Sequence, residues 1–219
     1  MSLWGKLVNF FNTFKFNRQN HSIVIWSEAS HYWETFTPLV NYFHKNKVKF
    51  IYLASDKNDI GLQQCKQSLY VGKNWTSFKF LNNIKADIMI MTTPGLGDLA
   101  IKRSKKVKHY CHIIHAPTDV LYYQRCSFEC FDSVLCSSDF QMNNIRKLEK
   151  IRGCEKKQLF KTGCLYYDER LKNKSKTTTD NNTILYAPSW GKISSLAYAM
   201  DIINNLLLYN YNVIFRPHP

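Results

Sequence analysis

A histidine follows an apolar, strand-like segment near the middle of the chain. Residues 109–114 are predicted to form a buried strand, and His115 comes directly after its last residue. In an open α/β sheet, side chains at the carboxyl ends of the strands line the ligand crevice. An imidazole titrates near neutral pH, so it can take a proton from a substrate hydroxyl. His115 is therefore our first candidate for a general base. The alternative is a core or loop histidine that is hydrogen-bonded to a nearby carbonyl.

Two further polar residues stand at the end of the first strand-like segment, residues 22–28: Glu28 is its last residue and His31 follows it. They would face the same crevice if this strand lies parallel to the one that precedes His115. There they would orient the substrate that His115 deprotonates. The alternative is that they cap a helix or are solvated.

Strand-like and helix-like segments alternate through most of the chain. Strands are predicted at residues 22–28, 48–55, 86–93, 109–114, 133–136 and 158–163. Apolar residues at helical spacing predict helices between several of them, including residues 139–152 and a shorter helix-like segment at 120–128. This alternation predicts an α/β fold over residues 21–171, with a doubly wound, Rossmann-like parallel sheet. Residues 94–97 (PGLG) are expected to form a turn, because the third glycine of a dinucleotide-binding motif is missing.

The two ends of the chain differ from this middle part. Residues 1–20 predict an amphipathic helix with a basic edge, which either lies in a membrane interface or packs on the protein's own domain. Residues 172–182 are polar and rich in residues that favour coil, as in a linker. Residues 183–219 predict a strand, a helix and a further strand, which would begin a second α/β unit.

The composition indicates an anionic partner. Of the 219 residues, 30 are basic and 16 are acidic, which gives a formal net charge of +14. Such a surface favours nucleic acid, an anionic membrane or a phosphorylated substrate. Nucleic acid is the weakest of the three, because no nucleic-acid motif is present and the lysines are spread over several segments. The basic run at residues 102–108 would meet lipid head groups or an anionic polymer, or form a solvated loop.

The cysteines indicate a reducing compartment. There are seven of them, an odd number, and several lie inside apolar runs, where a thiol behaves as a small hydrophobic group. Their spacing does not match a zinc site, so no structural metal is expected.

Four segments, in this order, resemble the CDP-glycerol glycerophosphotransferase family, bacterial enzymes that build teichoic-acid-like and capsular polymers. The segments are IWSEASHYWETFTPLV, HIIHAPTDVLYYQRCSFECFDSVLCSS, ILYAPSW and IFRPHP. The resemblance implies a two-domain, GT-B-like architecture with an N-terminal acceptor domain and a C-terminal donor domain, both Rossmann-like. Residues 183–219 would be the start of the donor domain, because the family's chains continue well past the last segment. Ala116 and Asp119 depart from the glycine and lysine that family members often carry there.

The resemblance also implies roles for single residues. His115 matches the family's histidine in the acceptor domain, believed to be the base, and His218 matches a histidine on the donor side. Arg216, in the same Arg-x-His pattern, would offset charge on the donor pyrophosphate, and Ser189 would reach a donor phosphate.

The implied reaction transfers an alditol phosphate from CDP-glycerol or a similar CDP-alditol to a hydroxyl group and releases CMP, without a cofactor. The acceptor would be a lipid-linked polyol phosphate or polysaccharide, and the protein would be peripheral at the cytoplasmic face of an anionic membrane. Self-association into a homo-oligomer is compatible with this role. The alternative hypothesis is a catalytically inactive, membrane-associated binding module of the same fold that lacks a donor site.

Overall fold

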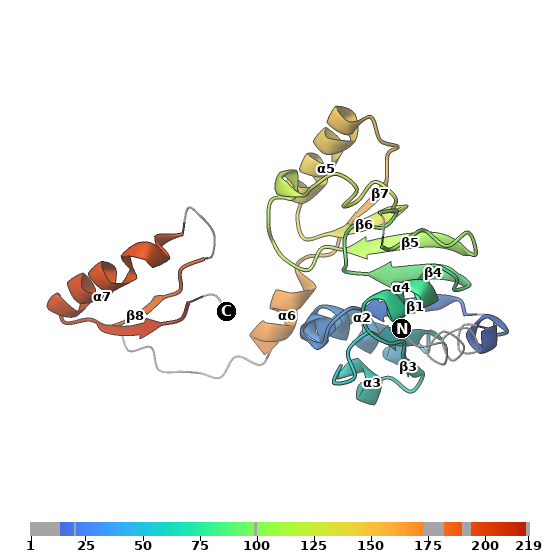
Figure 1. The fold of residues 1–219 in the computed structure, drawn as a ribbon, viewed down its shortest axis with the longest axis horizontal. Helices are drawn as coiled ribbons and strands as arrows, with labels where there is room; N and C mark the ends of the chain where they lie inside the picture. The colour runs from blue at the N-terminus through green and yellow to red at the C-terminus, as the bar shows by residue number, and fades with distance from the viewer. Residues whose placement is uncertain (1–13, 20, 99, 173–181, 190–193, 218–219) are drawn as a thin grey trace. The chain divides into compact units, whose positions relative to one another are not determined.

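The computed structural model describes residues 14–19, 21–98, 100–172, 182–189 and 194–217. The chain divides into two compact units, residues 1–174 and residues 175–219 (Figure 1). The division falls within the predicted linker, of which residues 173–181 lie outside the described residues.

The first unit is built on a seven-stranded sheet in the order β3-β2-β1-β4-β5-β6-β7. All neighbouring strands in it are parallel. The strands are β1 (Ile23–Ser27), β2 (Ile51–Ala54), β3 (Ser68–Tyr70), β4 (Ala86–Met91), β5 (Val107–Ile113), β6 (Ser133–Cys136) and β7 (Gln158–Lys161). The predicted α/β fold with a parallel sheet is therefore confirmed. The strand order reverses at β1, and ligands bind such sheets outside the carboxyl ends of the strands at the reversal.

Helices cover both faces of this sheet. They are α2 (Trp33–Lys45), α3 (Gly61–Gln64), α4 (Trp75–Leu81), α5 (Asp139–Arg152) and α6 (Leu165–Lys172). α2 and α6 pack against each other and share a core cluster with Ile25, Ile90 and Ile113. The alternate strand residues, such as Trp26 and Met91, pack on the opposite face with α4. Val134 and Cys136 of β6 pack with α5. Because successive strand residues point to opposite faces, the apolar strands predict a sheet that is buried on both sides.

Helix α5 has the boundaries that its sequence predicts. The Ser138 side chain caps its first turn by accepting a hydrogen bond from the Gln141 amide, and Gly153 ends it in the left-handed conformation. Ile145 and Leu148 face the core, as predicted.

The predicted helix-like segment at residues 120–128 is wrong. Only a 3₁₀ turn, η2 (Val120–Tyr122), forms there, and Asp119 caps it by accepting a hydrogen bond from the Leu121 amide. Cys126 has a φ of +67°, which a helix does not allow. Arg152 donates hydrogen bonds to the carbonyls of Tyr123 and Gln124, which a continuing helix would use itself.

The predicted turn at residues 94–97 is present. Gly95 and Gly97 both have positive φ angles, of 84° and 92°. A Cβ atom at Gly97 would lie 2.3 Å from the Cys130 sulfur, so this turn needs glycine for space as well as for conformation.

The described end of the amino-terminal segment packs on the first unit. Residues 14–17 are helical, and Phe16 is buried between the rings of His21 and Phe80. The Asn17 side chain also bonds to the backbone at Asn83 and Lys85. For residues 14–17 this contact agrees with the second of the two expectations, a helix that packs on the protein's own domain. Residues 1–13 lie outside the described residues. Among the helices of the described residues, none is long and apolar enough to cross a membrane.

The second unit contains one strand–helix–strand repeat, as the sequence predicts. Strands β8 (Thr183–Tyr186) and β9 (Asn212–Phe215) are parallel neighbours. The 3₁₀ turn η3 (Ser195–Tyr198) and helix α7 (Ala199–Leu208) connect them. Both strands are shorter than the apolar runs at residues 183–189 and 212–219 predict.

Candidate functional site

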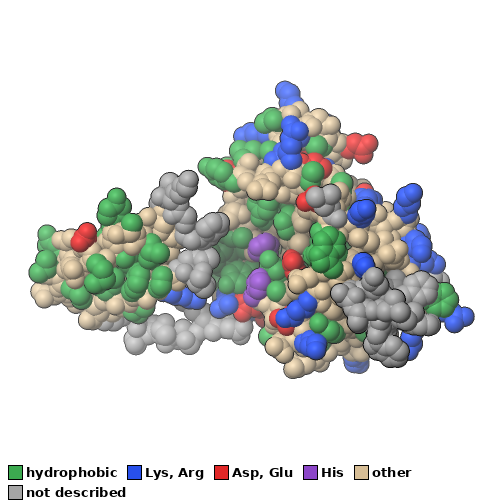
Figure 2. Space-filling model, viewed as in Figure 1, with side chains coloured by type: hydrophobic (Ala, Val, Ile, Leu, Met, Phe, Trp, Pro, Cys, Tyr) green, Lys and Arg blue, Asp and Glu red, His purple; other side chains and the backbone are tan. Residues whose placement is uncertain are grey.

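The structure places His115 two residues beyond the end of β5, at the carboxyl edge of the sheet. The side chain lines a cavity of about 360 Å³ that four segments form: the 3₁₀ turn η1 (Ser30–Tyr32), the first turn of α2, residues 115–117 and helix α6. Its polar and aromatic lining residues are His31, Tyr32, Thr35, His115, Tyr166, Tyr167 and Arg170. Figure 2 shows histidine side chains at the surface on the side of the first unit to which the β4 and β5 arrows of Figure 1 point.

Aromatic rings hold the His115 imidazole on one side. The Tyr32 ring meets it edge to face, with 5.0 Å between the ring centres, and the His31 ring lies 4.1 Å from that of Tyr32. Burial lowers the pKa of His115 below its usual value, and the neighbouring His31 lowers it further. This shift favours the neutral imidazole, which is the form that can accept a proton.

Buried polar atoms without a partner collect at this edge of the sheet. Among the described residues they are Thr92 Oγ1, His112 Nδ1 and His115 Nδ1. Thr92 directly follows β4, His112 lies near the end of β5, and the two strands are neighbours with Met91 beside His112. A buried polar group without a partner costs about 1–3 kcal/mol, so native proteins keep few of them. Three at the ends of two adjacent strands indicate a place where a ligand or ordered water supplies the missing hydrogen bonds.

His112 is deeply buried, with 1% of its surface exposed. Its ring lies against Phe128 and Phe131, with centre distances of 5.2 and 4.9 Å. Burial, and to a smaller extent His115, lowers the pKa of His112 to about 3. The sequence analysis did not select this residue, although a histidine inside an apolar strand is a visible signal.

Glu28 bridges the point where the strand order reverses. It follows β1, and its Oε2 accepts a hydrogen bond of 2.9 Å from the hydroxyl of Thr93, which follows β4. Burial raises the pKa of the Tyr32 hydroxyl, and Glu28 and Tyr123 raise it further. Glu28 and His31 therefore both lie near Tyr32, the ring that contacts His115, but of the two only His31 lines the cavity.

A buried carboxylate fixes the end of β1 beside Glu28. Asp59 is 1% exposed and accepts hydrogen bonds from the hydroxyls of Ser27 and Tyr52, at 2.7 and 3.1 Å, and from the Gly61 amide at 2.8 Å. Ser27 is the last residue of β1 and precedes Glu28. The loop after β2 thus holds the strand end from which Glu28 and His31 extend.

Arg170 connects the rim of the cavity to α2. Its Nε donates a hydrogen bond of 2.6 Å to Glu34, and its guanidinium lies 5.3 Å from the centre of the Tyr166 ring. The bond to Glu34 uses one of five N–H donors, which leaves others for a ligand. Tyr166 and Arg170 have the i, i+4 spacing of one helical face, and this spacing is the signal by which the sequence could have identified α6 as part of the site.

Helix α5 holds the loop that follows His115 by side-chain hydrogen bonds. The Gln141 amide group donates to the carbonyls of Ala116 and Thr118, at 3.1 and 2.9 Å. The Asn144 amide group donates to Asp119 at 2.8 Å. Gln141 and Asn144 are each 1% exposed, so α5 uses buried polar side chains to give this irregular loop one conformation.

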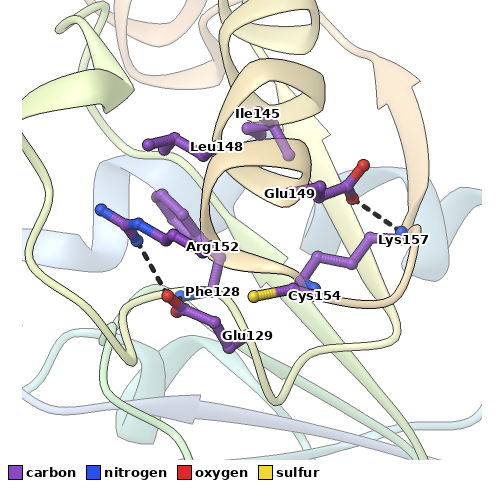
Figure 3. A pocket seen from close by; sticks show the side chains of 8 residues that line it. All are labelled: Phe128, Glu129, Ile145, Leu148, Glu149, Arg152, Cys154 and Lys157. Atoms are coloured by element: carbon purple, nitrogen blue, oxygen red, sulfur yellow. Dashed lines mark hydrogen bonds and ion pairs between the residues drawn. The ribbon is translucent and has the colours of Figure 1, made fainter.

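Figure 3 shows the carboxyl-terminal end of α5, where Arg152 pairs with Glu129 at 2.9 Å. Beside it, Glu149 accepts a hydrogen bond of 2.8 Å from the Lys157 amide. The cavity between these side chains holds only about 10 Å³, which is space for about one water molecule. Its residues are engaged with one another, so this pocket belongs to the framework that supports the loop.

Two predicted donor-site residues lie in the second unit, at the carboxyl edge of its two strands. Arg216 follows β9, and its amide donates a hydrogen bond of 2.9 Å to the Tyr186 carbonyl. Ser189 follows β8, and its carbonyl accepts a hydrogen bond from the Ser194 hydroxyl. The side chains of both are exposed. His218 lies outside the described residues.

Within the part of the chain that the structure describes, His, Cys, Asp and Glu side chains do not form a group of three or more that could hold a metal ion. Comparison with protein-family models, curated proteins and solved structures gives no significant match, so the family resemblance depends on the four sequence segments alone.

Proposed function

We propose that the chain is a CDP-alditol phosphotransferase of the CDP-glycerol glycerophosphotransferase type, with His115 as the general base. The observation that carries this proposal is an imidazole with an unpartnered nitrogen, beside a cavity at the carboxyl edge of a doubly wound sheet. Its lowered pKa favours the neutral form. A base for an alcohol nucleophile requires this protonation state and access to the substrate.

In the proposed reaction, the acceptor hydroxyl enters the cavity and gives its proton to His115. The oxygen of the acceptor hydroxyl forms a bond to the phosphorus that carries the alditol. The bond between that phosphorus and the bridging oxygen of the CDP pyrophosphate breaks, and CMP leaves with the electron pair. Glu28 and His31 orient the acceptor, and Arg170 adds a donor at the rim.

The donor side of the proposal depends on the sequence resemblance. In a GT-B-like arrangement the strand–helix–strand repeat of the second unit would begin the donor domain. Arg216 would then offset charge on the leaving CMP, and Ser189 and His218 would contact the donor phosphates. The exposed side chains of Arg216 and Ser189 are compatible with such contacts.

Attachment to an anionic membrane is part of the same proposal. Lys102, Lys105 and Lys106 are exposed at the amino edge of the sheet, while Arg103 and Lys108 pair with Asp132 and Asp87. Each lysine near an anionic leaflet would contribute about 1 kcal/mol. This edge is opposite to the carboxyl edge, so an acceptor that reaches the cavity from the membrane would extend along the length of the strands.

The test is CMP release from CDP-glycerol in the presence of a glycerophosphate-primed acceptor. We expect His115→Gln to lower kcat by about 10²- to 10⁴-fold, the usual contribution of a general base. His44→Gln is the matched control, because His44 is exposed in the last turn of α2 and does not line the cavity. CMP release that is the same in His115→Gln and His44→Gln would refute the role of His115. Measurable CMP affinity by calorimetry would support the enzyme, whereas the absence of both CMP binding and CMP release would favour the inactive binding module, which lacks a donor site.

A further inference from the structure

A second cavity lies on the other side of the loop that follows His115. We call it the tyrosine groove: about 650 Å³, lined by Pro94, Thr118, Asp119, Tyr122, Tyr123, Gln124 and Ser127. This volume is within the range of small-molecule sites, about 300–1,000 Å³. Pro94 follows Thr93, the partner of Glu28, so the groove opens at the same edge of the sheet as the His115 cavity. The two cavities have no lining residue in common.

The lining chemistry of the groove is unusual for this chain. The chain carries a formal net charge of +14, but none of the described residues that line the groove is Lys, Arg or His. Its one charged residue is Asp119, and one oxygen of this carboxylate already accepts hydrogen bonds from Leu121 and Asn144. The lining therefore does not favour a phosphate or another anion. The remaining polar groups are hydroxyls and an amide, which exchange hydrogen bonds with neutral partners.

An exposed aromatic ring borders these polar groups. Tyr122 has 89% of its surface exposed. Exposed aromatic side chains with a polar tip are frequent at recognition surfaces, because they offer a large contact area at little cost in conformational entropy. The electron-rich face of such a ring suits the C–H groups on one face of a sugar.

The groove is built in advance of any ligand. Gln141 and Asn144 bond to the loop at Thr118 and Asp119, and Arg152 bonds to the carbonyls of Tyr123 and Gln124. These bonds fix the backbone beneath the groove on both sides of Tyr122. A pre-ordered site loses less entropy on binding than a flexible loop would.

We propose that the tyrosine groove binds a neutral saccharide, with one sugar ring on the face of Tyr122 and its hydroxyls bonded to Asp119, Gln124 and Thr118. This inference does not depend on the transferase proposal, since it uses none of the residues assigned to the reaction.

The test is saturation-transfer difference NMR on the full chain with methyl α-D-glucopyranoside, N-acetylglucosamine and maltotriose as probes. We expect transfer to at least one of these sugars, and an affinity at least about tenfold lower in Tyr122→Ala, since an aromatic anchor dominates small sites. Tyr42→Ala is the matched control, because Tyr42 is 61% exposed on α2 and lies outside the groove. Circular dichroism checks that both variants fold.

A second readout locates the bound sugar. Tetranitromethane nitrates exposed tyrosines, and we expect the bound sugar to protect Tyr122 while Tyr42 reacts at an unchanged rate. Three results would overturn the proposal: no transfer to any of the three sugars, transfer that Tyr122→Ala leaves unchanged, or tighter binding of glucose 6-phosphate than of the neutral sugars. Sugar binding without CMP release, or the reverse, separates this proposal from the transferase proposal.

Discussion

Replacing His112 with leucine should remove a large part of the acid sensitivity of the first unit. His112 is fully buried and has a pKa of about 3 in the folded chain, compared with about 6.5 when it is exposed in the unfolded chain. Below pH 6.5 the unfolded chain therefore binds a proton that the folded chain does not bind. The contribution of neutral His112 to the free energy of unfolding is therefore fully present above pH 6.5, and it is lost as the pH falls toward 3.

The size of the effect follows from these two pKa values. At pH 5, which is about 1.5 units below the pKa in the unfolded chain, protonation of unfolded His112 lowers the free energy of unfolding. The loss is about 2 kcal/mol, at 1.36 kcal/mol per unit. At pH 6 the loss is only about 0.8 kcal/mol by the same relation. A loss of about 2 kcal/mol is a large fraction of the total stability of an ordinary domain.

Urea unfolding at several pH values measures this loss, and the buried Trp26 reports the first unit by its fluorescence. The stability difference between the wild-type chain and His112→Leu should fall by about 2 kcal/mol from pH 7.5 to pH 5. His44→Leu is the control, because His44 is exposed, and its difference from wild type should stay constant with pH. A constant difference for His112→Leu as well would refute the reasoning, since it would mean that a partner or water keeps the His112 pKa near its ordinary value.

Two further predictions concern the residues around the cavity. His31→Gln removes a neighbour that lowers the His115 pKa. NMR titration of the His115 ring should therefore give a higher pKa, and the acid limb of CMP release should move to higher pH. An unchanged titration would contradict the electrostatic effect of His31 on His115. Asp59→Ala leaves the hydroxyls of Ser27 and Tyr52 without their acceptor, so it should lower the free energy of unfolding by about 2–4 kcal/mol. The control is Asp56→Ala, at a partly exposed neighbour, which should lower it by less than about 1 kcal/mol. Equal losses in these two variants would show that the Asp59 hydrogen bonds do not stabilise the fold.

The apolar strands were predictable because a parallel sheet buries both faces, so its strands are continuous apolar runs that turns and helices separate. The same pattern placed His115, Glu28 and His31 at one edge, since the carboxyl ends of parallel strands share that edge. The order of the strands is not encoded in such a pattern. It is the position of β1 between β2 and β4 that brings Glu28 to Thr93.

The helix predicted at residues 120–128 failed for a reason that lies outside the segment. Its apolar residues have helical spacing, but Gln141, Asn144 and Arg152 on α5 take up carbonyl and carboxylate groups along residues 116–124. Bonds from a different helix therefore decide the conformation of this loop. In the same way, Tyr166 and Arg170 join the site only because α6 packs on α2, 120 or more residues earlier in the chain.

The three unpartnered buried atoms bear on what the first unit can bind. Each of them opposes folding by about 1–3 kcal/mol as long as neither water nor a ligand bonds to it, and they lie at or near the ends of β4 and β5. A ligand that bonds to them recovers a cost that the folded chain already carries, and so it gains more than it would from groups that water satisfies. Selectivity at this edge should therefore favour ligands with a hydroxyl group at the position of the missing partner, because a close analogue without that hydroxyl leaves the cost in place. Of the three residues, His115 lines the cavity, so there the requirement applies to the alditol acceptor of the proposed reaction and equally to any other polyol that enters.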